Sequence, residues 1–323
     1  MDNKNGIAIA GVILVDKINN LTAFPKCGEL AKINGVSFST GGCVPNVAID
    51  LKKAMPSLKV NAIGKIGNDE NGSYVIDTLT SNGVDCSMVK ECDDKTSFTE
   101  VMSVIGGQRT FFTYAGANSS FGYEDIDFDN LNVKMLHLGY FLLLDKVDSG
   151  DGEKILKRAK ELGIETSIDL VTENSNRFSL VIPCLKYTDN LIINESEAGS
   201  LTGITPTLSN LEEIALKLKQ MGVNKRVIIH TPELSVCASN NGVTKFASYD
   251  VPKNLIKGTT GAGDAFCAGA LIGIYLDKSD EEILNVASCI AITALFENDA
   301  ISGIKTIEEA KSLANTFKQK SFI

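Results

Sequence analysis

Residues 258–266 read GTTGAGDAF, and an apolar run from Ala265 to Leu276 follows directly. The run is long enough for a buried helix, so the glycine-rich turn lies at the amino end of that helix. Several backbone N–H groups then point the same way, and the helix dipole adds positive potential at this end. The pattern therefore predicts an anion site, most often one for phosphate.

A carboxylate, Asp264, stands beside this turn, although a bound phosphate would repel it. An enzyme that transfers a phosphoryl group has a use for it, because a base is needed where the acceptor hydroxyl meets that group. Alternatively, an aspartate after a glycine turn simply caps the helix and has no further role. We favour phosphoryl transfer because three further features of the chain fit it.

Apolar runs alternate with helical patterns along the chain. Strands are expected at residues 7–14, 60–66, 135–138, 164–170, 191–194 and 227–230. Helices are expected at residues 44–54, 71–81, 152–162, 211–221, 265–276 and 281–296. This α/β alternation predicts a mostly parallel sheet covered by helices on both faces. Ligands of such sheets bind at the carboxyl ends of the strands.

Two segments interrupt the alternation. Residues 16–38 are polar, and residues 97–114 hold two strand-like runs around Gly106-Gly107, a pair typical of a hairpin turn. We expect these segments to form a small sheet that stands off the main one as a lid over a site. Two ordinary surface excursions are the alternative.

Composition and net charge limit the classes of protein to which this chain can belong. The chain has 323 residues, 44% of them hydrophobic, and no linker or low-complexity break, so we expect one domain over residues 1–323. The net charge of −9 argues against nucleic acid and anionic membranes as partners, but not against a negatively charged small substrate. No run has the pattern of a signal peptide or a transmembrane segment, so we expect a cytoplasmic protein.

The cysteines and histidines form no metal motif in sequence. The eight cysteines are scattered without a C-x-x-C pair, and the two histidines are His137 and His230. This spacing argues against structural zinc and against a histidine-metal site. Reduced, mostly buried thiols are the expectation.

The first of the three further features is Asp16, which ends the first strand in the run GVILVD. A carboxylate at the carboxyl end of a strand can accept hydrogen bonds from sugar hydroxyls. The second is GGCVPN at residues 41–46, where Gly41 and Gly42 allow close backbone approach and Asn46 offers a donor and an acceptor. A turn-forming aspartate and a helix start at Pro45 are the respective alternatives.

The third feature is NESE at residues 194–197, after an apolar strand. Asn194 and Glu197 are three residues apart and share one helical face, so they can together hold hydrated magnesium and phosphate oxygens. An N-cap asparagine with a capping-box glutamate has the same spacing.

In this order, the features resemble the ribokinase-like sugar kinases, also called phosphofructokinase-B-type carbohydrate kinases. The stretch IGKIGNDENG at residues 63–72 is similar to that family's G-x-x-G-x-D-x-x-G segment. The resemblance extends from about residue 7 to about residue 310. It implies a three-layer α/β/α sandwich with a small β-sheet lid, which often makes a dimer contact.

The resemblance also implies roles for individual residues. Asp264 matches the catalytic base. The positions that match the anion hole are Gly261, Ala262 and Gly263. The positions that match sugar contacts are Asp16, Gly41, Gly42 and Asn46. The positions that match the nucleotide-phosphate and magnesium site are Asn194, Glu197 and Thr260.

The chain departs from the family at two places. Relatives commonly have an aspartate of a monovalent-cation site six residues before the base, where this chain has Gly258, which argues against potassium activation. Many relatives also carry T-x-G-x-x-G beside the nucleotide. Residues 230–235 read HTPELS here, so Pro232 and Ser235 replace the glycines. Either the nucleotide is held differently, or its affinity is reduced.

The implied activity is transfer of phosphate from ATP, with magnesium, to a hydroxyl of a hexose, pentose or sugar acid. A nucleoside kinase, and a non-catalytic sugar sensor with an eroded nucleotide site, are the alternatives. Arg109 in the lid can pair with an acidic or phosphorylated sugar, although a solvated surface arginine is the simpler interpretation. A dinucleotide-dependent oxidoreductase is rejected because Phe266 stands at the third glycine position of G-x-G-x-x-G.

Overall fold

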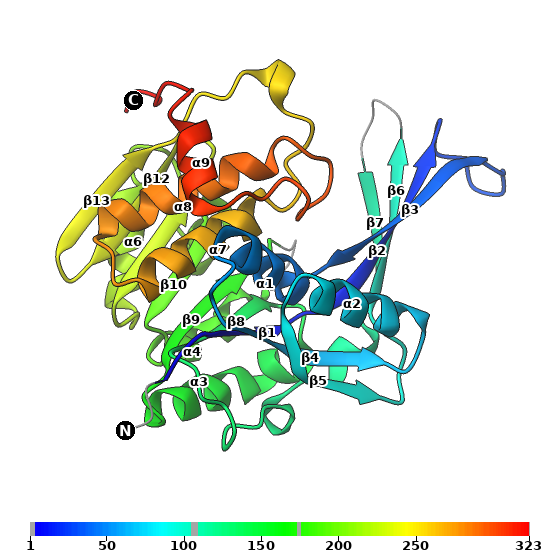
Figure 1. Cartoon of the computed structure of the whole chain (residues 1–323), viewed down its shortest axis with the longest axis horizontal. Helices are drawn as coiled ribbons and strands as arrows, with labels where there is room; N and C mark the ends of the chain where they lie inside the picture. The colour runs from blue at the N-terminus through cyan, green and yellow to red at the C-terminus, as the bar shows by residue number, and fades with distance from the viewer. Residues whose placement is uncertain (1–3, 105–108, 173–175, 323) are drawn as a thin grey trace.

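The large sheet is the centre of the molecule. The structure is a computed structural model that describes residues 4–104, 109–172 and 176–322. Within these ranges, nine strands form one sheet in the order β13-β12-β11-β10-β9-β8-β1-β4-β5 (Figure 1). The strands are β1 Ile7–Gly11, β4 Val60–Gly67, β5 Asp85–Cys92, β8 Met135–Phe141, β9 Glu165–Leu170, β10 Asn190–Asn194, β11 Arg226–His230, β12 Leu234–Ser239 and β13 Gly242–Ala247.

The pairing agrees with the predicted parallel sheet. All neighbours from β11 to β5 are parallel, whereas β12 and β13 add an antiparallel edge. All five residues of β1 are buried. Such continuous apolar runs form central strands because helices cover both faces of the sheet.

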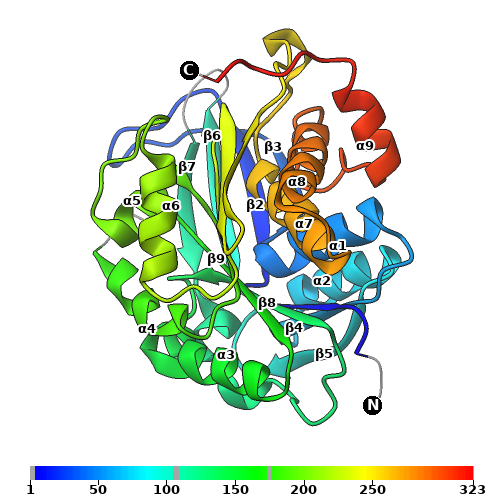
Figure 2. The same cartoon turned by 90° about the vertical axis from the view of Figure 1, so that its left-hand side faces the viewer.

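Helices lie on both faces, which confirms the predicted α/β/α sandwich (Figure 2). One face is covered by α1 Cys43–Ala54, α2 Glu70–Ser81, α7 Ala262–Tyr275, α8 Asp280–Ala294 and α9 Ile307–Ala314. The other face is covered by α3 Gly152–Glu161, α4 Ile182–Leu185, α5 Glu195–Thr202 and α6 Leu211–Gln220. None of these described helices is long and apolar enough to cross a membrane.

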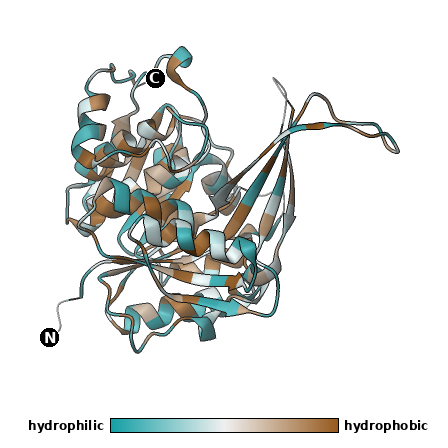
Figure 3. Cartoon of the chain, turned by 45° about the vertical axis from the view of Figure 1, so that its right-hand side comes forward, coloured by the Kyte–Doolittle hydropathy of each residue, from teal (hydrophilic) through white to brown (hydrophobic). Residues whose placement is uncertain are grey.

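A second, smaller sheet stands off the body, as Figures 1 and 3 show. Its order is β3-β2-β6-β7, with β2 and β6 parallel and the other pairs antiparallel. Its strands are β2 Leu14–Leu21, β3 Ile33–Gly41, β6 Phe98–Val104 and β7 Arg109–Tyr114. This sheet is the predicted lid, while the expected turn at Gly106-Gly107 lies outside the described residues.

The two faces of the lid differ. The strand register places Asp16 opposite Thr99 and Arg109 opposite Ser103, so both side chains belong to one face. The same register places Phe38, Lys17, Glu100 and Phe112 in a row on the other face. The lid therefore presents its predicted site residues on one side only.

The predicted end of the first strand is wrong. The strand stops at Gly11 rather than Leu14, because Gly11 has a φ of 136° and the chain turns out of the large sheet there. Asp16 consequently lies in lid strand β2, not at the edge of the main sheet. Apolar composition alone did not distinguish one long strand from two strands of different sheets.

Several elements have no counterpart in the prediction: β5, β12, β13, α4, α5 and α9. Strand β5 lies at the sheet edge and has no buried residue, so it lacks the apolar run used to recognise strands. The edge strand β13 is likewise exposed over much of its length. Helices α4, α5 and α9 are too short for a clear helical period.

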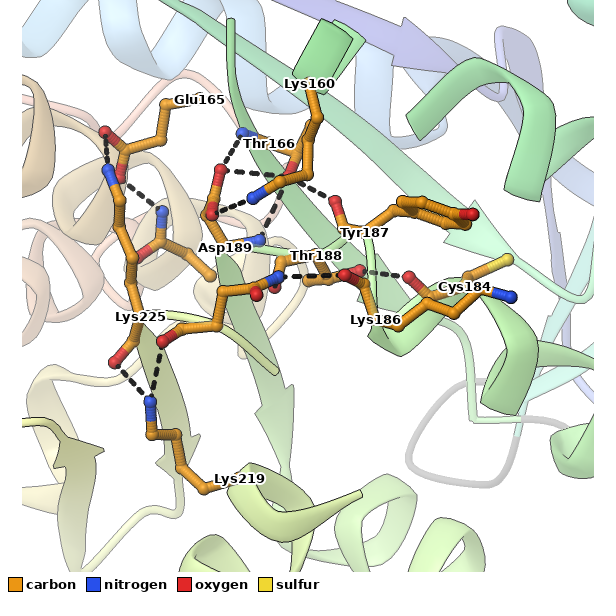
Figure 4. A network of polar contacts seen from close by, with 12 residues as sticks. Lys160, Glu165, Thr166, Cys184, Lys186, Tyr187, Thr188, Asp189, Lys219 and Lys225 are labelled. Atoms are coloured by element: carbon orange, nitrogen blue, oxygen red, sulfur yellow. Dashed lines mark hydrogen bonds and ion pairs between the residues drawn. The ribbon is translucent and has the colours of Figure 1, made fainter. Parts of the chain in front are cut away.

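The opposite edge of the sheet, at the amino ends of β9 and β10, is held by a polar network (Figure 4). Asp189 accepts hydrogen bonds from Lys160 Nζ at 2.6 Å and from the Thr166 N–H at 3.1 Å. In return, the Asp189 N–H donates to Thr166 Oγ1 at 3.0 Å. These contacts join neighbouring strands at the end of the sheet that carries no predicted site residue.

Candidate active site

Asp264 lies in the first turn of α7, whose N-cap is Gly261 with a φ of 76°. That left-handed conformation suits glycine and turns the chain into the helix. The Asp264 side chain makes no capping hydrogen bond. Helix α7 begins three residues before the predicted start, so the alternative of Asp264 as a simple N-cap is wrong.

Two side chains hold the Asp264 carboxylate. Asn46 Nδ2 donates to Asp264 Oδ2 at 2.9 Å. The Tyr140 hydroxyl lies 3.0 and 3.1 Å from the two carboxylate oxygens. These contacts bring Asn46, which is more than 200 positions away in sequence, to the predicted base.

Burial raises the pKa of Asp264 to about 7, and the hydrogen bonds from Asn46 and Tyr140 and the charge of Asp169 act as smaller influences. Burial dominates because a charged carboxylate loses solvation in the interior. The two hydrogen bonds act in the opposite direction because they stabilise the charged form. A carboxyl with this pKa can accept a proton near neutral pH.

Tyr140 has no counterpart in the sequence prediction. It follows Gly139 near the carboxyl end of β8, has a φ of 58°, and donates its N–H to Asp169 Oδ1 at 2.6 Å. Strained backbone of this kind in a non-glycine residue is often found at functional sites. Its place near a strand's carboxyl end was the available signal.

The turn before α7 presents backbone donors. The Ala262 N–H donates to the Thr259 carbonyl at 3.3 Å. Within the described residues, the N–H groups of Gly261 and Gly263 have no hydrogen-bond acceptor. The first N–H groups of a helix lack partners inside it, so they are available to an anion.

Two cavities meet at this turn. The smaller, of about 310 Å³, is lined by Gly261, Gly263, Asp264 and Tyr140, among others. The larger, of about 470 Å³, is lined by Thr259, Ala262, Gly263 and several apolar side chains of α7 and α8. Both cavities share Gly263, Asn194 and His230, so a ligand in one cavity can meet a ligand in the other.

Asn194 lines both cavities, and Glu197 lines the smaller one. They form a reciprocal capping box, with Asn194 Oδ1 accepting from the Glu197 N–H at 2.9 Å and Glu197 Oε2 accepting from the Asn194 N–H at 3.0 Å. The capping alternative is therefore present in the structure. Burial also raises the pKa of Glu197 to about 7.

Asp16 and the two glycines lie where lid and body join. A Cβ on Gly41 would lie 2.4 Å from Asp16 Oδ2 and 2.6 Å from Leu14 Cδ1, so a larger residue there would shift both side chains. Gly42 is the N-cap of α1, and Asn46 follows in the first turn. Burial raises the pKa of Asp16 to about 6. The structure thus brings Asp16, Gly41, Gly42 and Asn46 into one continuous region.

Arg109 links the lid to the turn before α7. Its Nη1 donates to Thr260 Oγ1 at 3.1 Å. The side chain is exposed, as expected of a solvated surface arginine, and it also contacts the main body through this hydrogen bond. The contact places the Asp16 face of the lid toward the Asp264 region.

Residues 230–235, where Pro232 and Ser235 replace the family's glycines, form a turn between β11 and β12 that is closed by hydrogen bonds to Thr231. Thr231 Oγ1 accepts from the N–H groups of Glu233 and Leu234, each at 3.0 Å. Pro232 lines the larger cavity, and its carbonyl accepts from Lys320 Nζ at 3.0 Å. Lys320 also lines the cavity, so a basic side chain stands beside the altered turn.

Comparison with known proteins agrees with this fold. The model of the pfkB family carbohydrate kinases matches residues 7–307. A ribokinase of Arabidopsis thaliana is 25% identical over 292 residues, which cover 88% of this chain and 74% of the relative. A 5-dehydro-2-deoxygluconokinase of Clostridium perfringens is 23% identical over 291 residues, which cover 87% of this chain and 85% of the relative.

A solved structure of the Arabidopsis thaliana ribokinase, complexed with ribose and ATP, has a TM-score of 0.83 at 23% identity. The match covers 97% of this chain and 99% of the other. Fold and family match together define a kinase of small carbohydrates. The chain belongs to the pfkB family of carbohydrate kinases and has the ribokinase fold.

Proposed function

We propose that this kinase transfers the γ-phosphoryl group of ATP to a hydroxyl of a small sugar, with Asp264 as the catalytic base. The observation that carries the proposal is the position of Asp264. The carboxylate is held by Asn46 and Tyr140 at the mouth of the α7 turn, in the wall of one of the two joined cavities. The larger cavity suits the nucleotide and the smaller one the reacting groups.

Asp264 accepts the proton of the sugar hydroxyl, whose oxygen attacks the γ-phosphorus as the bond to ADP breaks. The hydrogen bonds from Asn46 and Tyr140 orient the carboxylate, and a carboxylate retains further acceptor sites for the substrate. The N–H groups of Gly261 and Gly263 stabilise charge on the transferred group, as an anion hole does. Ala262 contributes less, since its N–H already donates to Thr259.

Sugar contacts are assigned to Asp16, Gly41, Gly42 and Asn46. Asn46 Oδ1 is buried without a hydrogen-bond partner within the described residues, and a sugar hydroxyl would supply one. The raised pKa of Asp16 indicates a partly desolvated acceptor. These observations support a polar ligand between the lid and α1.

Magnesium would accompany the nucleotide, and the residues present fit it. Both Glu197 oxygens already accept hydrogen bonds, from the Asn194 N–H at 3.0 Å and the Thr172 hydroxyl at 2.8 Å. Asn194 and Glu197 would therefore hold hydrated magnesium through its waters, which the ion releases reluctantly. When bound, the ion neutralises charge on the phosphates. Thr260 is assigned to the phosphate side of the same site.

The absence of the family's glycines from the turn at residues 230–235 motivates the alternative of a non-catalytic sugar sensor. The large cavity and the held carboxylate favour the kinase, because a sensor needs no base. A monovalent cation is not assigned, since Gly258 stands where relatives carry an aspartate.

A homodimer through the lid is part of the proposal. On the lid face opposite Asp16, the side chains of Val36, Phe38 and Phe112 are half-exposed, and the Lys17–Glu100 ion pair lies between Phe38 and Phe112. Exposed apolar patches mark contact surfaces. A second copy of the chain is the partner we assign to this face.

The test is ADP release with ATP and magnesium against hexoses, pentoses, sugar acids and nucleosides. We expect turnover on one class and a loss of about 10²- to 10⁴-fold in Asp264→Asn. Normal turnover in a folded Asp264→Asn protein would contradict the assignment of the base. No turnover on any compound, together with no ATP binding by calorimetry, would favour the sensor.

The same panel addresses Arg109. If the arginine binds an acidic group, Arg109→Met lowers kcat/KM for sugar acids more than for neutral sugars. An equal loss for both would leave Arg109 as a contact between lid and body, and nucleoside turnover would identify the in-family alternative.

A further inference from the structure

Three buried side chains from different elements converge beside the smaller cavity, which Asp169 and Cys267 line: His137 from β8, Asp169 from β9 and Cys267 from α7. His137 Nε2 lies 3.4 Å from Asp169 Oδ2 and 3.7 Å from Cys267 Sγ. All three potential ligand atoms lie within 4.8 Å of one another. The side chains are almost fully buried, with exposed fractions of 0%, 7% and 2%.

A hydrogen bond at His137 Nε2 accounts for only one of the two contacts that this nitrogen makes. Asp169 and Cys267 both approach the same ring nitrogen of His137, Nε2, which carries at most one proton. The other nitrogen, Nδ1, is hydrogen-bonded to Ser167 Oγ at 2.9 Å. Histidine ligands of metals have this pattern, with one nitrogen on the ion and the other oriented by a neighbouring polar group.

The two distances from His137 Nε2 match those between ligands of a small tetrahedral ion. Metal–nitrogen and metal–oxygen bonds of about 2.0–2.2 Å and a metal–sulfur bond of about 2.3 Å separate adjacent ligand atoms by about 3.3–3.7 Å. The observed separations of 3.4 and 3.7 Å fall at this spacing. Asp169 is also oriented, because its Oδ1 accepts the Tyr140 N–H at 2.6 Å.

The surroundings hold further buried carboxyl groups without a matching lysine or arginine among the described residues. In the part of the chain that the structure describes, neither Asp169 nor Asp264 pairs with a lysine or arginine. Nearby Asp50 on α1 is 0% exposed, and neither of its carboxyl oxygens has a hydrogen-bond partner. Buried carboxylates are costly unless they are paired or bind a metal. A cation at this point would offset that cost.

We propose that His137, Asp169 and Cys267 bind a thiophilic divalent cation such as Zn²⁺ or Co²⁺, at a site separate from the magnesium that accompanies ATP. The mixed nitrogen, oxygen and sulfur set selects such ions over Mg²⁺, which prefers oxygen alone. As the sulfur–metal bond forms, the Cys267 thiol releases its proton to solvent. Asp169 and Cys267 line the smaller cavity, so water from this cavity would complete the coordination. Metal binding by these three residues does not depend on the proposed phosphoryl transfer.

The experiment is a cobalt titration of the full chain after chelator treatment, without nucleotide. We expect one equivalent of Co²⁺ to bind, with a near-ultraviolet thiolate-to-cobalt band and the visible bands of a four-coordinate ion. Zn²⁺ should displace the cobalt and Mg²⁺ should not. Cys267→Ser should lose the near-ultraviolet band, whereas Ser167→Ala should keep it and weaken affinity by about 10- to 100-fold.

Cys184→Ser is the matched control, because Cys184 is a buried free thiol in α4. It should bind cobalt as the wild type does. Absence of the band at one equivalent, or its persistence in Cys267→Ser, would overturn the proposal. If Cys267→Ser does not fold, Ser167→Ala decides, since this variant retains all three ligands and unchanged cobalt affinity would then contradict the site.

Discussion

Asp264 shows how much of the proposed chemistry depends on the surroundings of one side chain. Its carboxylate would have an ordinary acidic pKa in solvent, but burial raises the pKa to about 7. Asn46 and Tyr140 limit the rise by donating hydrogen bonds to the charged form. The balance leaves a group that is ionised above neutral pH and still basic enough to accept a proton.

The pH dependence of turnover follows from this balance. The base must be ionised, so kcat/KM for the sugar should fall below about pH 7, by about tenfold per pH unit. Tyr140→Phe removes a hydrogen bond that lowers the pKa of Asp264, so the acidic limb should move to higher pH. Steady-state kinetics across pH measures both effects.

Tyr187→Phe is the control for this prediction, because Tyr187 belongs to the network at the opposite edge of the sheet. Its pH profile should match that of the wild type. An acidic limb that stays in place in Tyr140→Phe would mean that another group controls it.

At the scale of elements, the lid and α7 meet through a single described side-chain hydrogen bond, from Arg109 on β7 to Thr260. Both residues belong to segments that the fold positions separately, one in the small sheet and one before a helix of the main body. If the lid closes over the proposed sugar, we expect closure to depend on the alignment of these two residues.

A double-mutant cycle tests this contact. Arg109→Met and Thr260→Val should each raise KM for the sugar several-fold, and the double variant should add little to the larger single effect. The coupling free energy should be about 0.5–1.5 kcal/mol. Lys17→Met removes the Lys17–Glu100 ion pair within the lid and should combine additively with Thr260→Val. Full additivity for Arg109 and Thr260 would rule out the coupling.

At the scale of the whole molecule, the two edges of the large sheet have separate roles. The proposed chemistry lies at the carboxyl ends of the strands, whereas the Asp189 network lies at the amino ends (Figure 4). In parallel sheets this division is common, because ligands bind beyond the carboxyl ends. Stability and catalysis should therefore respond to different substitutions.

Asp189→Ala should lower the free energy of unfolding by about 2–3 kcal/mol, because Lys160 and the Thr166 N–H lose a charged acceptor. Turnover and KM should remain unchanged well below the unfolding transition. Urea unfolding and steady-state kinetics measure the two quantities. Asp277→Ala, which removes an exposed ion pair with Lys134, should change stability by less than about 1 kcal/mol. Loss of turnover in folded Asp189→Ala would contradict this division.

Assembly is also a property of the whole molecule. If this face of the lid forms a dimer contact, Phe112→Asp should give a monomer in sedimentation velocity, because a charge would be buried at the contact. Leu180→Asp changes another exposed apolar residue, away from the lid, and should leave the assembly unchanged. A wild-type protein that sediments as a monomer would contradict the proposal of a dimer.

Local sequence was sufficient to predict the alternation of strands and helices, the lid and the glycine turn before α7, because these depend on short-range periodicity and on residues with special backbone freedom. The long-range contacts required the fold. Asp16 lies in the lid because Gly11 ends the first strand, and Tyr140 reaches Asp264 only when β8 packs beside α7. His137, Asp169 and Cys267 meet for the same reason, because parallel strands and a helix bring these distant positions together. Their spacing along the chain does not predict this contact.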